Sequence, residues 1–298
     1  MPKPKTLLIW LIAILMPLLS VTPVVAARQW IRIGSWNIQN LGLRPWGQHP
    51  KAVAEHLLLA GVDLIALQEI HDTDGDASRR SNAVLDEALA LINRQECHDW
   101  TYRLFPKTDP SDTRQLTGVA WNRRVLTLAA PPTAVSRSPE AAAGWLRPPY
   151  AVQFTTGPGA TDLVIIPVHF KANTDGEAAG RRYRSEEARR LAEGLNRVAH
   201  YFGDKDIIVI GDTNCLNGSE AALQTLGAAG WRDLNASDQA TFRTGSAPFD
   251  RILVPRRQPE FRFSRQYVLS PGDPAAHFRA VSDHYVVMTT VRVMPDDD

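Results

Sequence analysis

Short apolar runs, many of them rich in β-branched residues, recur along the chain and predict buried β-strands. The run at residues 207–210 is followed by Gly211 and then by the polar residues Asp212 and Asn214. A run without polar alternation is typical of a strand buried on both faces. Two short polar side chains at its end can turn into the same small volume. An Asx turn that closes the strand explains this stretch equally well, so the other strand ends decide its meaning.

The hydrophobic pattern predicts more strands than helices. Strands are predicted at residues 30–38, 62–67, 101–105, 118–121, 125–128, 150–154, 163–169, 206–210, 250–254, 261–269 and 285–293. Helices, recognised by apolar stripes of helical period, are predicted at residues 49–60, 78–96, 180–202 and 220–226. Residues 130–149 are predicted to form a long surface excursion. Hairpin-like successions with a few crossovers favour an α/β sandwich over a purely parallel doubly wound sheet.

The N-terminal segment has the pattern of a secretory signal peptide. Lys3 and Lys5 precede an apolar run at residues 7–19, and small residues at 25–27 precede Arg28. This order predicts cleavage after Ala27, which leaves residues 28–298 as one domain, secreted or periplasmic. The segment is almost long enough to span a bilayer, so a retained membrane anchor is the alternative.

Charge and cysteine content narrow the function only a little. The net charge of +1 provides no general attraction to nucleic acid or acidic membranes, so any such attraction is local. Cys97 and Cys215 are too few for a disulfide scaffold, and whether they form one bridge stays open.

Polar residues that could bind a metal or move a proton stand at the ends of several different predicted strands. They are Asn37, Glu69, His169, Asp212, Asn214, Asp250, Asp283 and His284. Each residue alone could be a turn residue, a helix cap or a buried hydrogen-bond partner. These explanations do not predict a polar residue at the end of so many different strands. Oxygen donors with few histidines suit Mg²⁺, whereas zinc is typically bound by closely spaced His or Cys pairs. A histidine polarised by a carboxylate can take a proton from water. The set therefore predicts hydrolysis of a phosphate ester.

Six motifs in order carry a resemblance to a known family. They are residues 36–40 (Trp-Asn-Ile-Gln-Asn), 67–69 (Leu-Gln-Glu), 167–171 (Pro-Val-His-Phe-Lys), 211–214 (Gly-Asp-Thr-Asn), 249–254 (Phe-Asp-Arg-Ile-Leu-Val) and 282–285 (Ser-Asp-His-Tyr). In this respect the chain resembles the endonuclease/exonuclease/phosphatase superfamily, which has the deoxyribonuclease-I-like fold. The resemblance implies a four-layered α/β sandwich with two mostly antiparallel central sheets packed face to face and helices outside.

The resemblance also implies roles at a metal and phosphate site. Glu69 would bind a divalent metal, Mg²⁺ in the first place with Mn²⁺ or Ca²⁺ as options. Asn37 would lie beside Glu69, and Asp283 would be a further ligand. Asp212 and Asn214 would contact the attacked phosphate and its nucleophile or leaving group.

For proton transfer, the resemblance implies that Asp250 orients His284 as the general base. His169 would be a second histidine that hydrogen-bonds the phosphate. In deoxyribonuclease I a carboxylate supports the corresponding histidine, and its counterpart here is expected to be Gln115. A neutral amide at Gln115 would make His169 less basic.

The substrate is less determined than the reaction. A nucleic acid needs Arg and Lys contacts to its backbone, and the candidates are Arg114, Lys171 and Arg181, with Arg182 and Arg184 beside Arg181. Arg181, Arg182 and Arg184 would equally form a solvated helix face.

A phospholipid headgroup is the alternative substrate, for a sphingomyelinase-like enzyme. Trp145 and Leu146 in the excursion could then dock on a membrane. An inositol-phosphate phosphatase would be expected to have a denser basic pocket. A secreted nuclease ranks first, and a non-catalytic binding protein on the same fold ranks last.

Overall fold

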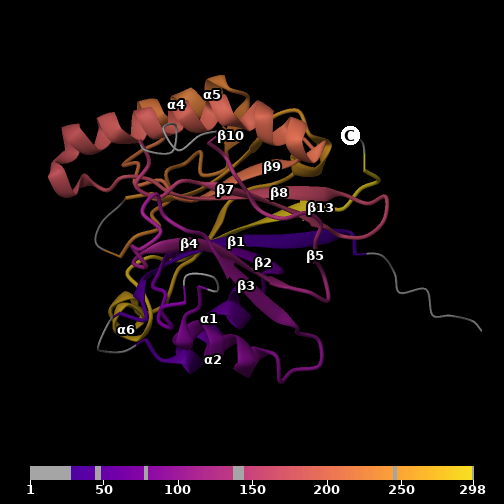
Figure 1. Ribbon diagram of the computed structural model, residues 1–298, viewed down its shortest axis with the longest axis vertical. Helices are drawn as coiled ribbons and strands as arrows, with labels where there is room; N and C mark the ends of the chain where they lie inside the picture. Colours follow the sequence, from indigo (N-terminus) through magenta and orange to yellow (C-terminus); the bar gives the residue numbers. More distant parts are fainter. Residues whose placement is uncertain (1–27, 44–47, 77–79, 137–143, 244–246, 297–298) are drawn as a thin grey trace, which may run out of the picture.

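The computed structural model describes residues 28–43, 48–76, 80–136, 144–243 and 247–296, and two mixed β-sheets form its centre (Figure 1). The first sheet has the strand order β12-β13-β1-β2-β4-β3. Its strands are β1 (Trp30–Leu41), β2 (Leu64–Ile70), β3 (Trp100–Leu104), β4 (Leu116–Asn122), β12 (Tyr267–Leu269) and β13 (Val286–Arg292). Only β1 and β2 pair in parallel in this order.

The second sheet has the order β10-β11-β9-β8-β7-β5, and β6 also pairs with β7. Its strands are β5 (Thr127–Leu128), β6 (Thr133–Ala134), β7 (Tyr150–Thr155), β8 (Asp162–His169), β9 (Ile207–Asp212), β10 (Trp231–Asp233) and β11 (Asp250–Pro255). Here β8 and β9 are the parallel pair, and the other pairs are antiparallel. The two mostly antiparallel sheets confirm the predicted fold class.

Helices cover the outer face of each sheet, so the molecule has four layers (Figure 1). The helices α1 (Pro50–Ala60) and α2 (Ala83–Ile92) lie on the first sheet, and α4 (Glu177–Phe202) and α5 (Ala221–Ala228) lie on the second. Apolar side chains form one core between the two sheets and one beneath each helix layer. Because β9 is covered on both faces, its apolar run needs no polar alternation.

Capping residues in the sequence explain where α1 ends and where α2 and α6 (Pro274–Ala280) begin. Gly61 adopts a left-handed conformation after α1, and its backbone N–H bonds the carbonyls of Leu57 and Leu58. The side chain of Asn82 accepts the N–H of Leu85 and caps α2. The short helix α6 is capped in the same way by Asp273.

Several element bounds differ from prediction, chiefly where elements are short. The predicted strand at 125–128 is reduced to Thr127–Leu128, and that at 261–269 is reduced to Tyr267–Leu269 after the 3-10 helix Pro259–Phe261. A second 3-10 helix, Asn173–Asp175, precedes α4. The elements β6, β10 and α6 were not predicted, because two to seven residues are too few to show a hydrophobic period.

The compartment predictions concern residues outside this structure. The predicted signal peptide, residues 1–27, lies outside the described residues. Among the helices that the structure describes, none is both long and apolar enough to cross a membrane. Cys97 is exposed, Cys215 is buried, and both are free, so the structure contains no Cys97–Cys215 bridge.

The strand register brings the polar strand ends to one edge of the sandwich. Asn37 in β1 pairs with Gln68 in β2, next to Glu69. In the other sheet Asp212 lies between His169 on one side and Asp250 on the other. The ends of both parallel strand pairs therefore face one another across the two sheets.

Candidate active site

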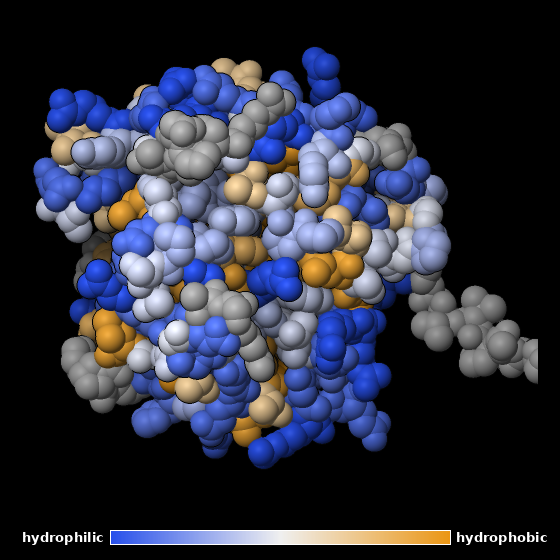
Figure 2. Space-filling model, viewed as in Figure 1, coloured by the Kyte–Doolittle hydropathy of each residue, from blue (hydrophilic) through white to orange (hydrophobic). Residues whose placement is uncertain are grey.

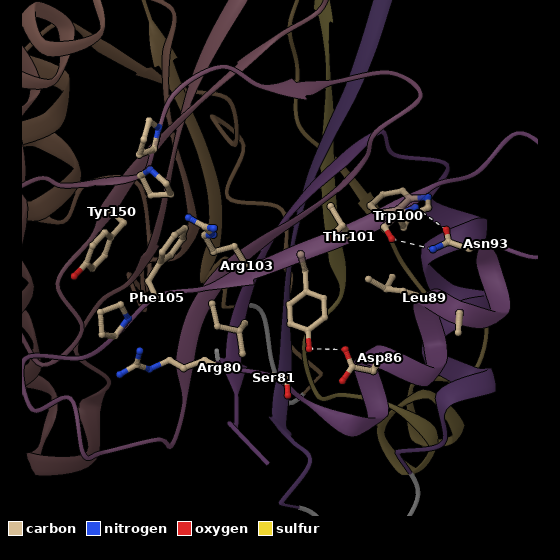
Figure 3. A pocket seen from close by; sticks show the side chains of 16 residues that line it. Arg80, Ser81, Asp86, Leu89, Asn93, Trp100, Thr101, Arg103, Phe105 and Tyr150 are labelled. Carbon is tan, nitrogen blue, oxygen red and sulfur yellow. Dashed lines mark hydrogen bonds between the residues drawn. The ribbon is translucent and has the colours of Figure 1, made fainter. Parts of the chain in front are cut away.

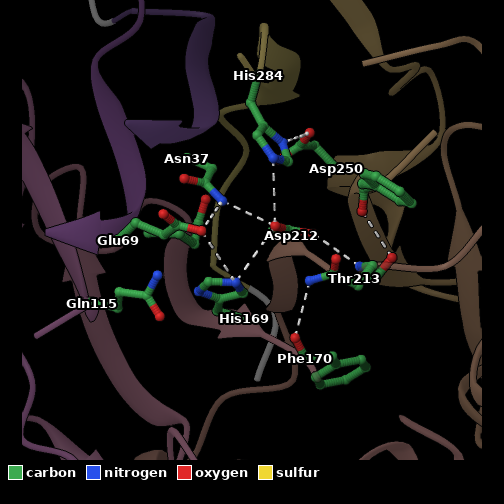
Figure 4. A network of polar contacts seen from close by, with 12 residues as sticks. Asn37, Glu69, Gln115, His169, Phe170, Asp212, Thr213, Asp250 and His284 are labelled. Atoms are coloured by element: carbon green, nitrogen blue, oxygen red, sulfur yellow. Dashed lines mark hydrogen bonds and ion pairs between the residues drawn. The ribbon is translucent and has the colours of Figure 1, made fainter. Parts of the chain in front are cut away.

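Asn37 links the two sheets at this edge through its side-chain amide. Its Nδ2 atom donates to Oε1 of Glu69 at 3.2 Å and to Oδ2 of Asp212 at 3.0 Å (Figure 4). Its Oδ1 atom accepts the backbone N–H of Gln39. One buried amide thus fixes a carboxylate from each sheet, which is what brings the two halves of the predicted site together.

The end of β9 is shaped by Gly211. Its φ angle is +148°, and a Cβ atom there would lie 2.1 Å from the carbonyl oxygen of Val168 on the neighbouring strand. Only glycine lets the two backbones approach so closely. After this point Oδ1 of Asp212 accepts the N–H of Asn214, and Nδ2 of Asn214 donates to the carbonyl of Phe170. The side-chain amide of Asn214 therefore ties this loop to the residue after β8.

His284 and Asp250 form a buried hydrogen-bonded pair. Nδ1 of His284 lies 2.8 Å from Oδ2 of Asp250, and Nε2 of His284 lies 3.8 Å from Oδ2 of Asp212 (Figure 4). Burial lowers the pKa of His284, but Asp250, Asp212 and the adjacent Asp283 outweigh it and raise this pKa to about 10. Asp283 itself is half-buried.

The Asp212 carboxyl is buried among these groups. Burial raises its pKa to about 6, His284 opposes the rise, and Asp250 adds to it. Asp212 and His284 are thus buried together, and the charge of each favours the charged form of the other. Phe242 and Phe249 pack beside the His284 ring, with centroid separations of 4.9 and 6.2 Å, and shield it from solvent.

His169 completes the group on the other side of Asp212. Its Nε2 atom is 3.6 Å from Oδ2 of Asp212 and 3.8 Å from Oε1 of Glu69. Burial, followed by the charges of Arg147, His284 and Lys107, lowers the pKa of His169 well below its usual value. Its Nδ1 atom is buried and has no hydrogen-bond partner in the described part of the chain.

Gln115 is near this histidine in Figure 4, but its hydrogen bonds run elsewhere. Its amide nitrogen donates to Oδ1 of Asn40 and its amide oxygen accepts from Arg147. Gln115 therefore does not support the Nδ1 atom of His169 by a hydrogen bond. The expectation that His169 is weakly basic agrees with the depressed pKa, but the cause is burial.

Strained backbone is concentrated at this edge of the sandwich. Glu69, in a β-strand, has a φ of +61°, and its side-chain Oε2 accepts the backbone N–H of Asn40. Six non-glycine residues in the described part of the chain have positive φ: Gln39, Asn40, Glu69, Gln115, Asn214 and Asp238. All except Asp238 belong to the site or its supporting network. Such conformations cost about 1–3 kcal/mol each and accumulate at functional sites.

The donors at this edge suit magnesium. Glu69 and Asp212 offer carboxylate oxygens, and Asn37 fixes both. No cluster of three or more His, Cys, Asp or Glu side chains suitable for a metal occurs among the described residues. Mg²⁺ is typically bound by one or two carboxylates together with water and substrate phosphate, whereas structural zinc needs a complete set of protein ligands. A carboxylate from each sheet therefore gives this edge a donor set that fits Mg²⁺.

Arg147 belongs to the candidate active site, but it was not predicted from the sequence. Its buried guanidinium bonds the side-chain oxygen of Gln115 at 2.5 Å, and Glu69 and Asp212 are the acidic groups that interact with it most strongly. It lies at the end of the predicted surface excursion, where no periodic pattern draws attention to it. A proline on its C-terminal side and an adjacent strand are the only local signals.

The predicted basic residues Arg114 and Lys171 each form an ion pair with a nearby carboxylate. Arg114 is exposed and pairs with Asp112. Lys171, just after β8, has its ammonium 2.8 Å from Asp175 and 3.0 Å from the hydroxyl of Thr174.

The α4 arginines behave in two ways. Arg181 is half-exposed and pairs with Glu177, as a solvated helix face would. Arg184 is fully buried and makes a bidentate pair with Glu220. Its prediction as a nucleic-acid contact is therefore wrong, because it joins α4 to the start of α5.

A large cavity lies away from these residues. It has a volume of about 720 Å³ and runs along the edge strand β3 between α2 and Tyr150, and Arg80, Arg103 and Phe105 are among its lining residues (Figure 3). None of the predicted catalytic or metal-binding residues lines it. The largest described cavity is therefore not the candidate active site, which is identified instead by the cluster of titratable groups.

The chain belongs to the Endonuclease/Exonuclease/phosphatase family, whose model matches residues 34–284. This confirms the resemblance that the motifs indicate. Enzymes of this family are metal-dependent phosphoesterases and nucleases. No curated protein matches the chain in sequence.

Solved structures share the fold at low sequence identity. The catalytic domain of human Nocturnin, with a bound sulfate anion, has a TM-score of 0.60 and 17% identity, and the match covers 89% of this chain and 95% of that one. A family protein from Bacteroides thetaiotaomicron has a TM-score of 0.63 and 16% identity, with 89% and 95% covered. A mannosyl-6-phosphatase from Bacteroides thetaiotaomicron VPI-5482 has a TM-score of 0.60 and 13% identity, with 88% and 99% covered.

Proposed function

We propose that the protein is a divalent-metal-dependent phosphodiesterase, and that its substrate is a nucleic acid. The observation that carries the reaction is the buried His284–Asp250 pair, whose outer nitrogen faces Asp212 and the Asn37–Glu69 pair. A histidine oriented by one carboxylate and directed at a metal-binding edge is the arrangement needed to activate water against phosphorus.

The protein's own groups divide the work. Asp250 accepts the Nδ1 proton of His284 and thereby leaves Nε2 as the atom that takes a proton from the attacking water. Asp212 orients that water, and His169 donates from Nε2 to a phosphate oxygen. When bound at Glu69, Mg²⁺ would add positive charge that stabilises the phosphate oxygens and opposes protonation of His284.

Basic groups near the site support a phosphodiester of a nucleic acid. Arg147 provides a buried positive charge beside the carboxylates, which suits one phosphate. Arg114, exposed next to Gln115, is available to a neighbouring phosphate of a polymer. A net charge of +1 means that such binding depends on these local groups.

The lipid alternative is less well supported. The ring of Trp145 is buried in the core under α4, so of the predicted docking pair only Leu146, 48% exposed, faces solvent. On the face shown in Figure 2, apolar residues occur as small separate groups among hydrophilic ones. A membrane-docking enzyme would be expected to carry a continuous apolar patch.

A substrate panel tests the proposal. The purified protein is assayed on plasmid DNA, RNA, sphingomyelin, inositol phosphates and mannose 6-phosphate, each with Mg²⁺, with Mn²⁺ and with EDTA. We expect metal-dependent cleavage of DNA or RNA that disappears in His284→Ala and Asp212→Asn. Cleavage of sphingomyelin or of a phosphomonoester, without cleavage of nucleic acid, would reverse the substrate assignment. Undiminished turnover in either folded variant would remove the assigned site.

We also propose that the protein is exported. The support is the order of basic, apolar and small residues at positions 1–27. Expression of the full chain in a bacterium, followed by fractionation and N-terminal sequencing, is expected to find a mature protein that begins at Arg28 outside the cytoplasm. A membrane-bound product that retains Met1 or Pro2 would identify the segment as an anchor.

A further inference from the structure

Side chains hydrogen-bond both the backbone N–H and the backbone carbonyl of His284. Its N–H donates to Oγ of Ser282 at 3.1 Å, and the Ser282 hydroxyl donates to the carbonyl of Asn37. Its carbonyl accepts Nε1–H of Trp36 at 3.2 Å and also bonds Nε2 of His277 at 3.0 Å. Trp36, His277 and Ser282, which are not among the proposed catalytic residues, therefore fix the backbone of His284 and with it the position of the ring that faces Asp212.

His277 is connected to a second imidazole. Its Nδ1 atom lies 2.8 Å from Nε2 of His56 in α1. The two rings are 4.6 Å apart between centroids, and His56 also stacks on Trp36 at 5.6 Å. Trp36 and His277 are buried and His56 is half-buried. The helices α1 and α6 and the strand β1 thus meet behind the catalytic histidine.

The hydrogen bonds fix the protonation of both rings. A carbonyl oxygen only accepts, so Nε2 of His277 carries a proton and donates to His284. In a neutral ring Nδ1 of His277 is then an acceptor, so Nε2 of His56 must donate to it. Burial lowers the pKa of His277 to about 4 and also lowers the pKa of His56. His277 is therefore neutral at neutral pH with its proton on Nε2, and the two bonds point in one direction, from α1 to His284. The backbone of Ala52 hydrogen-bonds the His56 ring and opposes the fall in its pKa.

We propose that His56 and His277 are positioning residues for the reaction, which hold His284 in place through a directional pair of imidazole hydrogen bonds to its carbonyl group. This inference rests on the proposed role of His284 as the general base. An apolar ring of similar size would fill the same space, but it would neither donate to the carbonyl nor fix the rotation of the residue. A displacement of about 1 Å at a reacting group lowers turnover by as much as about a hundred-fold.

Steady-state kinetics on bis(p-nitrophenyl) phosphate with Mg²⁺ test the proposal. In His277→Phe, kcat is expected to fall about ten- to a hundred-fold with little change in KM. His277→Gln keeps an amide N–H where Nε2 lies and is expected to recover most of this loss. His56→Gln, which keeps its donor, is expected to be more active than His56→Phe. If the glutamine variants are as poor as the phenylalanine variants, or if His277→Phe keeps the full kcat, the proposal is overturned.

A matched control separates positioning from a general effect of losing a half-buried histidine. His98 accepts a hydrogen bond from Trp100 and lines a cavity that includes neither His56 nor His277. His98→Phe is therefore expected to leave kcat unchanged. Thermal unfolding of all variants shows whether the loss of kcat follows lost stability. A kcat that tracks the melting temperature across both histidine positions would contradict a positioning role.

A second measurement does not depend on activity. Nitrogen-15 spectra of the imidazole rings in the metal-free protein at pH 7 are expected to show His277 protonated at Nε2 and bare at Nδ1, and His56 protonated at Nε2. Protonation of His277 at Nδ1 instead would overturn the hydrogen-bond direction. If the protein hydrolyses no phosphate ester, the proposed function fails, and these spectra still decide whether the imidazole pair is built as described.

Discussion

The Nδ1 atom of His284 lies 2.8 Å from the Oδ2 atom of Asp250, and both side chains are buried. The two residues are 34 positions apart in the chain, and the pairing of β11 with β9 places Asp250 next to Asp212. The second oxygen of Asp250, Oδ1, is buried and has no hydrogen-bond partner among the residues that the structure describes. Oδ2 of Asp250 therefore orients the imidazole and stabilises its charge.

Replacement of Asp250 by asparagine is expected to lower kcat about 10³- to 10⁴-fold. Asparagine has the same shape, but its amide can donate to Nδ1 and so select the wrong tautomer of His284, as happens when the aspartate of a serine-protease triad is changed. The measurement is kcat on bis(p-nitrophenyl) phosphate at saturating Mg²⁺, with circular dichroism to check folding. A folded Asp250→Asn protein with kcat near that of the wild type would contradict the assigned pair.

Glu69→Gln is expected to raise the Mg²⁺ concentration for half-maximal activity about ten-fold or more. The substitution keeps the shape of the side chain and one acceptor oxygen, which can retain the hydrogen bond from either Asn37 or Asn40. It removes the negative charge that attracts a hard cation. A Mg²⁺ titration of activity and isothermal titration calorimetry measure the change. Glu55→Gln on α1 provides an exposed control. Unchanged Mg²⁺ affinity in Glu69→Gln would remove this residue from the metal site.

The two predicted arginines on α4 are expected to differ sharply in their effect on stability. Arg184 is fully buried against Glu220, so Arg184→Met leaves an uncompensated buried carboxylate and is expected to cost about 3–5 kcal/mol. Arg181 is half-exposed, and Arg181→Met is expected to change the free energy of unfolding by less than about 1 kcal/mol. Urea unfolding of both variants measures the difference. Equal stabilities would show that the Arg184–Glu220 pair contributes little.

The sequence predicted the strands and their polar ends because buried strands have a local signature. An unbroken apolar run such as residues 207–210 identifies a strand covered on both faces, and the polar residue after it marks the edge. Glu69, His169 and Asp212 were predicted in this way. In the structure, His169 lies within 4 Å of both Glu69 and Asp212.

The sequence could not predict features that depend on contacts between distant residues. Arg184 looks like its exposed neighbours until Glu220, 36 positions later, is placed against it. Arg147 and His277 lie in segments without hydrophobic period, and their importance comes from the groups that surround them. The positive φ of Glu69 likewise follows from the network around it and not from its residue type.

Glu187 is expected to make stability depend on pH. It is buried in α4, and burial raises its pKa to about 7 although its Oε2 accepts the backbone N–H of Lys171. The folded state then binds a proton that the unfolded state has released between about pH 4.5 and pH 7, so this carboxyl group lowers stability as pH rises through that window. Glu187→Gln keeps an oxygen acceptor for Lys171 and removes the titration. Its free energy of unfolding is expected to equal that of the wild type near pH 4 and to exceed it by up to about 3 kcal/mol at pH 8. Urea unfolding at several pH values without added metal measures the difference, with Glu193→Gln on the exposed face of α4 as control. A difference between wild type and Glu187→Gln that is the same at pH 4 and pH 8 would contradict the raised pKa.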